Sequence, residues 1–338
     1  MTNDKNDLSR RLFLKGATGA AALNMLPIKM AFAAAFPERN IQIFVPTRAG
    51  GGADRNMRAF TSVWKNYLKT NFEAGFYPGA AGRVGYETYM GKAKADCYNL
   101  IFGNMGPEVL NWVVKKPTFD LKSFLYIAQV DQDPGIVFVS KKNKKLKTID
   151  DIVKEGKKRT LNVGVSRLAH PASLGVLALG RHTGAKFNLV PLSGGRNTRA
   201  GVGTGEMDLG ALPSGSVVRK QKQFDIVAVF DKENPLPKRM KKAVVVNDHF
   251  GMKLPPLYAG ARAFGIKREA IEKHPDRYKV LSDTLKKVYT DPAYKKAVKK
   301  TKAPWKYIRY GSPSDCEKYV QYITAIGEQY KSLLTGKS

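Results

Sequence analysis

The sequence feature that most constrains this chain is residues 41–60, IQIFVPTRAGGGADRNMRAF. A short apolar strand is followed by three consecutive glycines, Gly50, Gly51 and Gly52, and then by a helical segment. Consecutive glycines leave backbone N–H groups uncovered by side chains, and the first N–H groups of a helix have no partner within it. Since a helix start also carries partial positive charge, the turn predicts a site for a small anion such as a carboxylate. A purely structural turn is the alternative, and neither a Walker sequence nor G-x-G-x-x-G spacing is present.

A second turn of small residues lies at residues 77–85, YPGAAGRVG, and opens another helix. It repeats the first arrangement, in which exposed main-chain amides precede a helix start. Two such turns in successive β–α units are expected to meet at the carboxyl ends of the strands, where open α/β folds bind ligands.

Strands and helices alternate along the rest of the chain. Strands are predicted at residues 99–103, 124–130 and 135–140, and helices at 107–114 and 146–156, with Thr148 as a helix N-cap. A second α/β unit spans residues 162–249, with strands at 162–165, 187–191, 207–212 and 224–230 and a helix at 172–182. Helices are then predicted at 276–289, 292–301 and 313–334. This rhythm predicts a doubly wound α/β architecture.

The amino end has the pattern of an export signal. Residues 9–15, SRRLFLK, match a twin-arginine motif, and the apolar stretch after it is too short to span a bilayer. Ala31-Phe32-Ala33 is a small-x-small site, so residues 1–35 are predicted to be a signal peptide cleaved near Ala33 to Ala35, which would place the mature chain in the periplasm. An ordinary amphipathic helix with a chance arginine pair is the alternative.

The chain carries a formal net charge of +30. Such a basic protein raises a nucleic-acid hypothesis, but the lysines are spread over residues 141–147, 238–242 and 295–302 without forming one binding module. We expect no nucleic-acid partner, and a solvated basic surface that attracts anionic ligands or an anionic membrane surface.

Catalytic and metal-binding motifs are missing from the sequence. Cys97 and Cys316 lack C-x-x-C spacing, and the alternatives are a disulfide or two free buried thiols, of which we favour the second. The four histidines form no H-x-x-x-H pattern, and G-x-S-x-G is absent. We therefore expect neither an enzyme nor a resident cofactor or metal.

Several motifs resemble a known family. Residues 37–58 fit P-x-x-x-I-x-I-x-V-P-x-x-A-G-G-G-x-D-x-x-x-R, and residues 78–85 fit P-G-A-A-G-x-x-G. Residues 95–100, ADCYNL, place Cys97 where a glycine is usual, and VPLSGG at 190–195 precedes G-x-M-D at 205–208. In these features the chain resembles the solute-binding proteins of the tripartite tricarboxylate transporters, the Bug family, from about Phe36 to the C-terminus.

This resemblance implies a two-lobed periplasmic receptor with a Venus-flytrap fold, each lobe a mostly parallel sheet flanked by helices. Lobe 1 would comprise residues 36–138 and 258–338, and lobe 2 residues 139–257. The receptor would be a monomer that captures a small organic carboxylate, either a di- or tricarboxylate or an aromatic carboxylate. It would deliver this ligand to a carrier made of one large and one small membrane subunit. A periplasmic sensor that presents its ligand to a membrane signalling protein is the alternative, because the same binding cleft serves both functions.

In the family, main-chain groups of the two first-lobe turns hold the ligand carboxylate, and the second lobe closes over it. This chain departs from the family pattern at Arg48, Arg167, His170 and Arg196. We expect Arg167 and Arg196 to hold a second carboxylate bidentately and His170 to respond to pH, with extension of the arginines into solvent as the alternative. Tyr77 is interpreted as a cleft wall or a packing residue. The residues expected to bind the ligand are Pro46, Thr47, Arg48, Ala49, Gly50, Gly51, Gly52, Asp54, Gly79, Ala80, Ala81, Gly82, Ser166, Arg167, His170, Ser193, Gly194, Gly195, Arg196 and Asp208.

Overall fold

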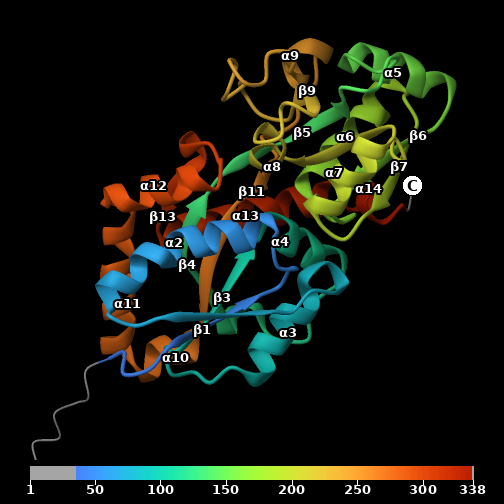
Figure 1. The fold of residues 1–338 in the computed structure, drawn as a ribbon. Helices are drawn as coiled ribbons and strands as arrows, with labels where there is room; N and C mark the ends of the chain where they lie inside the picture. The colour runs from blue at the N-terminus through green and yellow to red at the C-terminus, as the bar shows by residue number, and fades with distance from the viewer. Residues whose placement is uncertain (1–35, 337–338) are drawn as a thin grey trace, which may run out of the picture. The chain divides into compact units, whose positions relative to one another are not determined.

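The computed structural model describes residues 36–336. The predicted signal peptide, residues 1–35, lies outside the described residues. Within the described part, two β-sheets flanked by helices form the framework (Figure 1).

The first sheet has six strands in the order β13-β4-β12-β3-β1-β2. Its strands are β1 (Ile41–Val45), β2 (Phe72–Phe76), β3 (Asn99–Asn104), β4 (Phe124–Asp131), β12 (Arg262–Lys267) and β13 (Ile308–Gly311). The helices of this lobe are α2 (Gly52–Leu68), α3 (Arg83–Lys92), α4 (Met105–Val114), α10 (Arg268–Lys273), α11 (Pro275–Thr290), α12 (Pro292–Lys300) and α13 (Pro313–Gln329), with short 3-10 turns at Ala80–Gly82, Leu121–Ser123 and Trp305–Tyr307.

The second sheet has seven strands, six of them in the order β10-β9-β5-β8-β6-β7, with β11 paired to β5. Its strands are β5 (Asp133–Ser140), β6 (Leu161–Val165), β7 (Phe187–Pro191), β8 (Leu209–Pro213), β9 (Phe224–Val229), β10 (Val244–Val245) and β11 (Tyr258–Gly260). Its helices are α5 (Ile149–Lys158), α6 (Pro171–Thr183), α7 (Gly195–Thr204), α8 (Ser214–Val218) and α9 (Val246–Phe250), and the chain ends in α14 (Lys331–Thr335).

The apolar face of α2 packs against the C-terminal part of the chain. Met57, Phe60 and Trp64 are buried at helical spacing on this face. The Phe60 ring lies 5.2 Å from the ring of Phe264 in β12 and 5.2 Å from that of Tyr294 in α12. Residues beyond Lys267 therefore complete the core of the first lobe.

The chain passes between the sheets at two points. β4 and β5 are separated only by Gln132, and β11 and β12 only by Ala261. The lobe boundaries expected from the sequence lie after residue 138, inside β5, and before residue 258, at the start of β11. In the structure the chain changes sheet at Gln132 and Ala261 instead. The prediction of a mostly parallel sheet in each lobe is wrong, because both sheets are mixed. The strands that cross between the lobes run antiparallel to their neighbours: β12 to β3 and β4, and β5 to β8 and β9.

Most predicted elements are present, with a few differences. Thr148 caps α5 as predicted, because its side chain accepts a hydrogen bond from the N–H of Asp151 and the Asp151 side chain accepts one from the N–H of Thr148. Strands β11, β12 and β13 were not predicted. The last helix, expected to run unbroken over residues 313–334, breaks at Tyr330 into α13 and α14.

The two cysteines are free and buried, which confirms the favoured alternative. Cys97 adopts a φ of +66°, in the left-handed region that favours glycine. This backbone geometry explains why glycine is usual at this position in the family that the chain resembles. In the described part of the chain, no helix is both long and apolar enough to cross a membrane.

The close approach of α3 to the strand end of β1 gives a prediction. A Cβ placed on Gly85 would lie 2.5 Å from the Cα of Pro46, whereas one on Gly91 in the same helix meets nothing within 4 Å. We expect Gly85→Ala to lower the free energy of unfolding by about 1–3 kcal/mol through this overlap. Gly91→Ala, the matched control, should raise it by up to about 1 kcal/mol through helix propensity. Urea unfolding measures both, and equal effects of the two substitutions would contradict the packing.

Candidate functional site

The two glycine-rich turns of the first lobe leave the same edge of the sheet. β1 and β2 are parallel neighbours in which Val45 lies opposite Phe76, and the N–H of Tyr77 donates to the Val45 carbonyl at 2.8 Å. The starts of α2 and α3 therefore lie side by side. The aromatic ring of Tyr77 stacks on Phe44 with 5.1 Å between centroids, so this side chain packs against the sheet.

The first turn is held in shape by Asp54. One carboxylate oxygen accepts a hydrogen bond from the N–H of Gly50 at 2.7 Å, and the other accepts one from Nε of Arg58 at 2.6 Å. Gly50 has a φ of +73°, which glycine adopts without strain. The first i to i−4 hydrogen bond runs from the N–H of Arg55 to the Gly51 carbonyl at 3.3 Å. The preceding N–H groups of the α2 turn have no partner inside the helix.

The second turn has left-handed backbone throughout. Gly79, Ala80, Ala81 and Gly82 have φ values of +142°, +42°, +57° and +101°. Such values at two alanines are strained and persist only where surrounding contacts enforce them. One of those contacts comes from the second lobe, because Nη1 of Arg167 donates to the Ala81 carbonyl at 2.5 Å.

Arg167 is also paired with a buried carboxylate. Its Nη1 lies 3.2 Å from Oε1 of Glu108, whose side chain is 1% exposed. Burial raises the pKa of Glu108 from 4.5 to about 7, against the opposing effect of the Arg167 charge. In this structure the guanidinium connects the two lobes through Glu108 and Ala81, and the expectation that Arg167 holds a ligand carboxylate stays a prediction.

His170 is a structural residue here. Its side chain is buried, and Nδ1 accepts a hydrogen bond from the N–H of Ala172 at 3.1 Å at the start of α6. Burial, with the nearby charges of Arg167 and Arg262, holds its pKa well below the ordinary value. The expected pH-responsive cleft residue is therefore a neutral helix cap.

The second-lobe turns also share one sheet edge. β6 and β7 are parallel with Val165 opposite Pro191, and the N–H of Gly194 donates to the Ser166 carbonyl at 3.2 Å. The Arg196 side chain is exposed at the start of α7. Asp208, by contrast, precedes β8 at the amino ends of the strands, where it pairs with Arg159 at 2.8 Å. The structure thus separates Asp208 from the other predicted residues.

The remaining predicted residues are distributed over these turns. Arg48, Ala49, Gly79, Ala80 and Ser193 are exposed, and Pro46 is buried. The hydroxyl of Thr47 is buried without a hydrogen-bond partner among the described residues. Gly52 lines a pocket, Gly51 is the N-cap residue of α2, and Gly195 is the first residue of α7.

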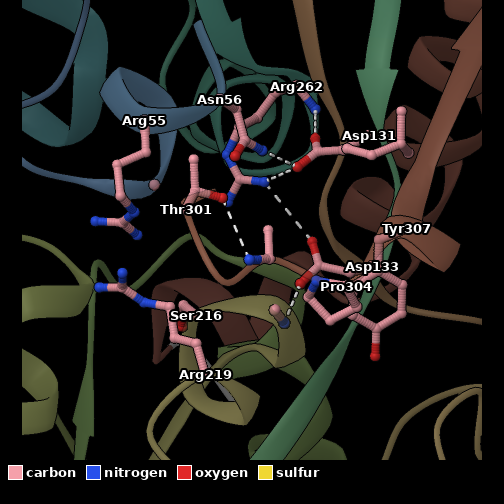
Figure 2. Close-up of a pocket in the computed structure, with 14 residues that line it drawn as sticks. Arg55, Asn56, Asp131, Asp133, Ser216, Arg219, Arg262, Thr301, Pro304 and Tyr307 are labelled. Atoms are coloured by element: carbon pink, nitrogen blue, oxygen red, sulfur yellow. Dashed lines mark hydrogen bonds and ion pairs between the residues drawn. The ribbon is translucent and has the colours of Figure 1, made fainter. Parts of the chain in front are cut away.

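The pocket at the start of α2 is lined from both lobes (Figure 2). Gly52, Arg55 and Asn56 of α2 face Gly215, Ser216 and Arg219 of the second lobe, and Arg262 lies at the crossing of the chain. The cavity volume is about 30 Å³, so an organic acid of several carbon atoms fits only if the walls move apart. In Figure 2 the guanidinium groups of Arg55 and Arg219 point toward each other from opposite sides.

Sequence reasoning missed the arginines of this site. Arg55, Arg199 and Arg219, named here the arginine set, come from α2, α7 and the end of α8. The pKa of Arg55 is lowered to about 9 by burial and by the charges of Arg219, Arg262 and Arg199. Burial and the charges of Arg219 and Arg196 lower the pKa of Arg199 to about 10. In the sequence, the only indication that one of these arginines lies at the site was the position of Arg55 in the first turn of the helix after the glycines.

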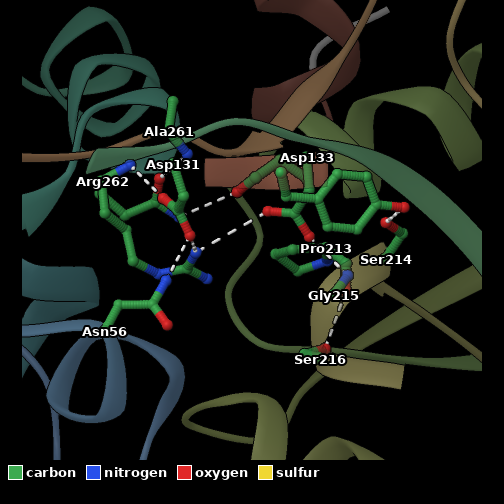
Figure 3. A network of polar contacts seen from close by, with 12 residues as sticks. Asn56, Asp131, Asp133, Pro213, Ser214, Gly215, Ser216, Ala261 and Arg262 are labelled. Carbon is green, nitrogen blue, oxygen red and sulfur yellow. Dashed lines mark hydrogen bonds and ion pairs between the residues drawn. The ribbon is translucent and has the colours of Figure 1, made fainter. Parts of the chain in front are cut away.

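Arg262 differs from the arginine set because it is neutralised (Figure 3). Its guanidinium bonds to Asp131 and lies 3.7 Å from Oδ1 of Asp133. Asn56 donates to Asp131 as well, and the N–H of Gly215 donates to Asp133 at 2.6 Å. Burial raises the pKa of Asp133, and the neighbouring Asp131 charge acts in the same direction. No cluster of His, Cys, Asp or Glu residues suited to a metal ion occurs within residues 36–336.

Comparison with known proteins identifies the fold. No family model matches the chain, and no curated protein does. Solved structures do match: a TctC solute-binding protein from Polaromonas is 20% identical with a TM-score of 0.63, covering 89% of this chain and 99% of that one. The periplasmic binding protein BugD is 17% identical with a TM-score of 0.73, over 88% and 98%. MatC from Rhodopseudomonas palustris, solved with bound malate, is 17% identical with a TM-score of 0.70, over 88% and 100%.

These likenesses define the class of fold to which the chain belongs. It has the two-lobed α/β fold of periplasmic binding proteins, which confirms the predicted fold class. Within that class, its structure is similar to those of TctC and BugD over nearly the whole length of those proteins.

The buried Glu108 gives a pH prediction. Since folding raises its pKa from 4.5 to about 7, its contribution to stability is fully present below pH 4.5 and is lost as the pH rises through about 7. We expect Glu108→Gln to reduce the fall in the free energy of unfolding between pH 5 and 7.5 by roughly 1–3 kcal/mol. A smaller fall in the free energy of unfolding should remain in this variant, because folding also raises the pKa of Asp133.

Urea unfolding at the two pH values measures this difference. The exposed Glu272, replaced by Gln, is the control and should leave the pH dependence unchanged. Identical pH dependence in the wild type and Glu108→Gln would show that Glu108 ionises as it does in the unfolded chain.

Proposed function

We propose that the protein is an extracytoplasmic solute-binding receptor of the Bug type that captures a small organic carboxylate between its lobes. The observation that carries this proposal is the start of α2. Its first N–H groups lie beside a pocket in which Gly52 and Arg55 of one lobe face Arg219 of the other. Helix starts and guanidinium groups both stabilise carboxylates.

Features of the fold and of its relatives support this function. The turns after β1 and β2 share one sheet edge, and ligands of open α/β folds bind at such edges. MatC was solved with malate, a dicarboxylate. Only two short connections join the sheets, at Gln132 and Ala261, and hinged closure around a ligand is characteristic of periplasmic receptors. Binding rather than catalysis is the function that this arrangement favours.

The proposed place of action and partner follow from the sequence motifs. The twin-arginine segment would export the protein to the periplasm. There the loaded receptor would deliver its ligand to the large and small membrane subunits of a tripartite carrier. The alternative is a sensor that presents the ligand to a membrane signalling protein, and co-purification from membranes with one or the other class of protein distinguishes the two.

A thermal-shift screen with mono-, di- and tricarboxylates tests the receptor function. A ligand that binds only the native state raises the midpoint of unfolding. We expect at least one carboxylate to raise it reproducibly, with calorimetry confirming a single site. No shift with any carboxylate, at concentrations up to several millimolar, would contradict the proposed function.

The first turn gives a specific prediction. Asp54→Ala removes the acceptor that fixes the Gly50 N–H, and we expect the affinity for the carboxylate found in the screen to fall about 10-fold, equal to about 1.4 kcal/mol. Asp276, also in the first turn of a helix but exposed on α11, is the matched control. Asp276→Ala should leave the affinity unchanged. Equal affinities of both variants would place the ligand away from the α2 turn.

A further inference from the structure

We infer that this pocket selects ligands with at least two acid groups, and that the arginine set binds the acid group that the α2 turn does not hold. The inference rests on the proposed function and adds the charge of the ligand to it. It is carried by one buried and two half-buried arginines that form no ion pair among the described residues.

The members of the arginine set reach the site from both lobes. Arg55 belongs to the first turns of α2 in lobe 1, whereas Arg199 lies in α7 and Arg219 follows α8 in lobe 2. Arg55 and Arg219 line the same pocket, with their guanidinium groups facing each other (Figure 2). Arg199 is near enough for its charge to act on Arg55.

These guanidinium groups lack carboxylate partners among the described residues. No carboxylate oxygen of the described residues lies within 4.0 Å of a guanidinium nitrogen of the arginine set. Nη1 of Arg55 donates a hydrogen bond to the Gly50 carbonyl at 2.6 Å. Arg199 is 9% exposed, and Nε of Arg219 is buried with no acceptor. A buried charge without a partner is unfavourable, so these side chains are arranged for a group that is not part of this chain.

The nearby carboxylates are already engaged. Asp54 holds the Gly50 N–H and Arg58, while Asp131 and Asp133 surround Arg262. The arginine set therefore forms no ion pair with these carboxylates, although the charge of Asp54 acts favourably on Arg55. One carboxylate at the α2 turn would leave most of the arginine set unpaired, whereas a second or third acid group forms charge-assisted hydrogen bonds with it.

A series of ligands with one carbon chain tests the charge requirement. Butyrate, glutarate and propane-1,2,3-tricarboxylate share a three-carbon chain that carries one, two and three carboxylates. By calorimetry we expect wild-type affinity to rise at least 10-fold from the monoacid to the diacid, and not to fall for the triacid. Arg199→Gln and Arg219→Gln should each reduce the diacid-to-monoacid ratio at least 5-fold. The exposed Arg181, replaced by Gln, makes the same change in net charge on lobe 2 and should leave that ratio unchanged.

The ligand-free protein gives a second readout that does not depend on the ligand's carbon chain. If Arg199 and Arg219 are held for a ligand, their replacement by Gln relieves repulsion and burial of charge, so the midpoint of thermal unfolding should rise by about 2 °C or more. Arg181→Gln should leave it unchanged. A fall in the midpoint for both Arg199→Gln and Arg219→Gln would show that these arginines are structural, and would overturn the inference.

The results separate this inference from the proposed function. If butyrate binds as tightly as the diacid and the triacid, the charge requirement is overturned but the carboxylate receptor remains. The same holds if the arginine variants lose affinity equally for all three ligands. Failure of every carboxylate in the thermal-shift screen overturns the receptor function itself. If none of the three ligands binds while monoacids of other shapes do, the inference is overturned as well.

Discussion

The arrangement of the two lobes depends on the buried ion pairs around Arg262. Arg262 follows the crossing from β11 to β12, and its partners Asp131 and Asp133 flank the crossing from β4 to β5. The backbone N–H of Arg262 also donates to Oδ1 of Asp131 at 2.9 Å, so both connections between the sheets are fixed at one place. Buried ion pairs contribute little net stability, but removal of one partner leaves a buried charge uncompensated. The cluster therefore specifies one geometry for the crossing, and through Asn56 and Gly215 it determines where α2 and α8 face each other.

This cluster also explains why the pocket is positive. Asp131 and Asp133 are buried carboxylates that line the pocket, and Arg262, Asn56 and the N–H of Gly215 occupy them. Arg55, Arg199 and Arg219 are half-buried or buried there and form no ion pair among the described residues, and burial lowers the pKa of each. The net charge of +30 is a poor guide to this site, because most of it comes from lysines on the surface, where water screens them. The guanidinium groups of Arg55 and Arg219, half-buried at the pocket, bear on this site more directly.

The sequence predicted local structure well and long-range partners poorly. The α2 turn, the Thr148 cap and the helical face of Phe60 and Trp64 follow from neighbouring residues, and all are present. β12 was missed because RAFGIK is short and carries a central glycine and terminal charges, although it lies in the middle of the first sheet. The pairing of Arg167 with Glu108 was missed because the two residues lie 59 positions apart in the sequence. The arginine set was missed for the same reason: its members share no motif and meet only through tertiary folding.

Two contacts between the lobes act in opposite directions, and their balance determines what a ligand must supply. Arg167 joins the lobes through Glu108 and the Ala81 carbonyl, an attraction that requires no ligand. Arg55 and Arg219 oppose it, because like charges face each other across the same cleft. A ligand shifts such an equilibrium only through a difference in its affinity for the two arrangements. A neutral molecule leaves the repulsion in place, whereas an anion that touches both lobes converts it into attraction. In the proposed receptor, the negative charge of the ligand, rather than its apolar surface, would thus be the property that couples binding to closure.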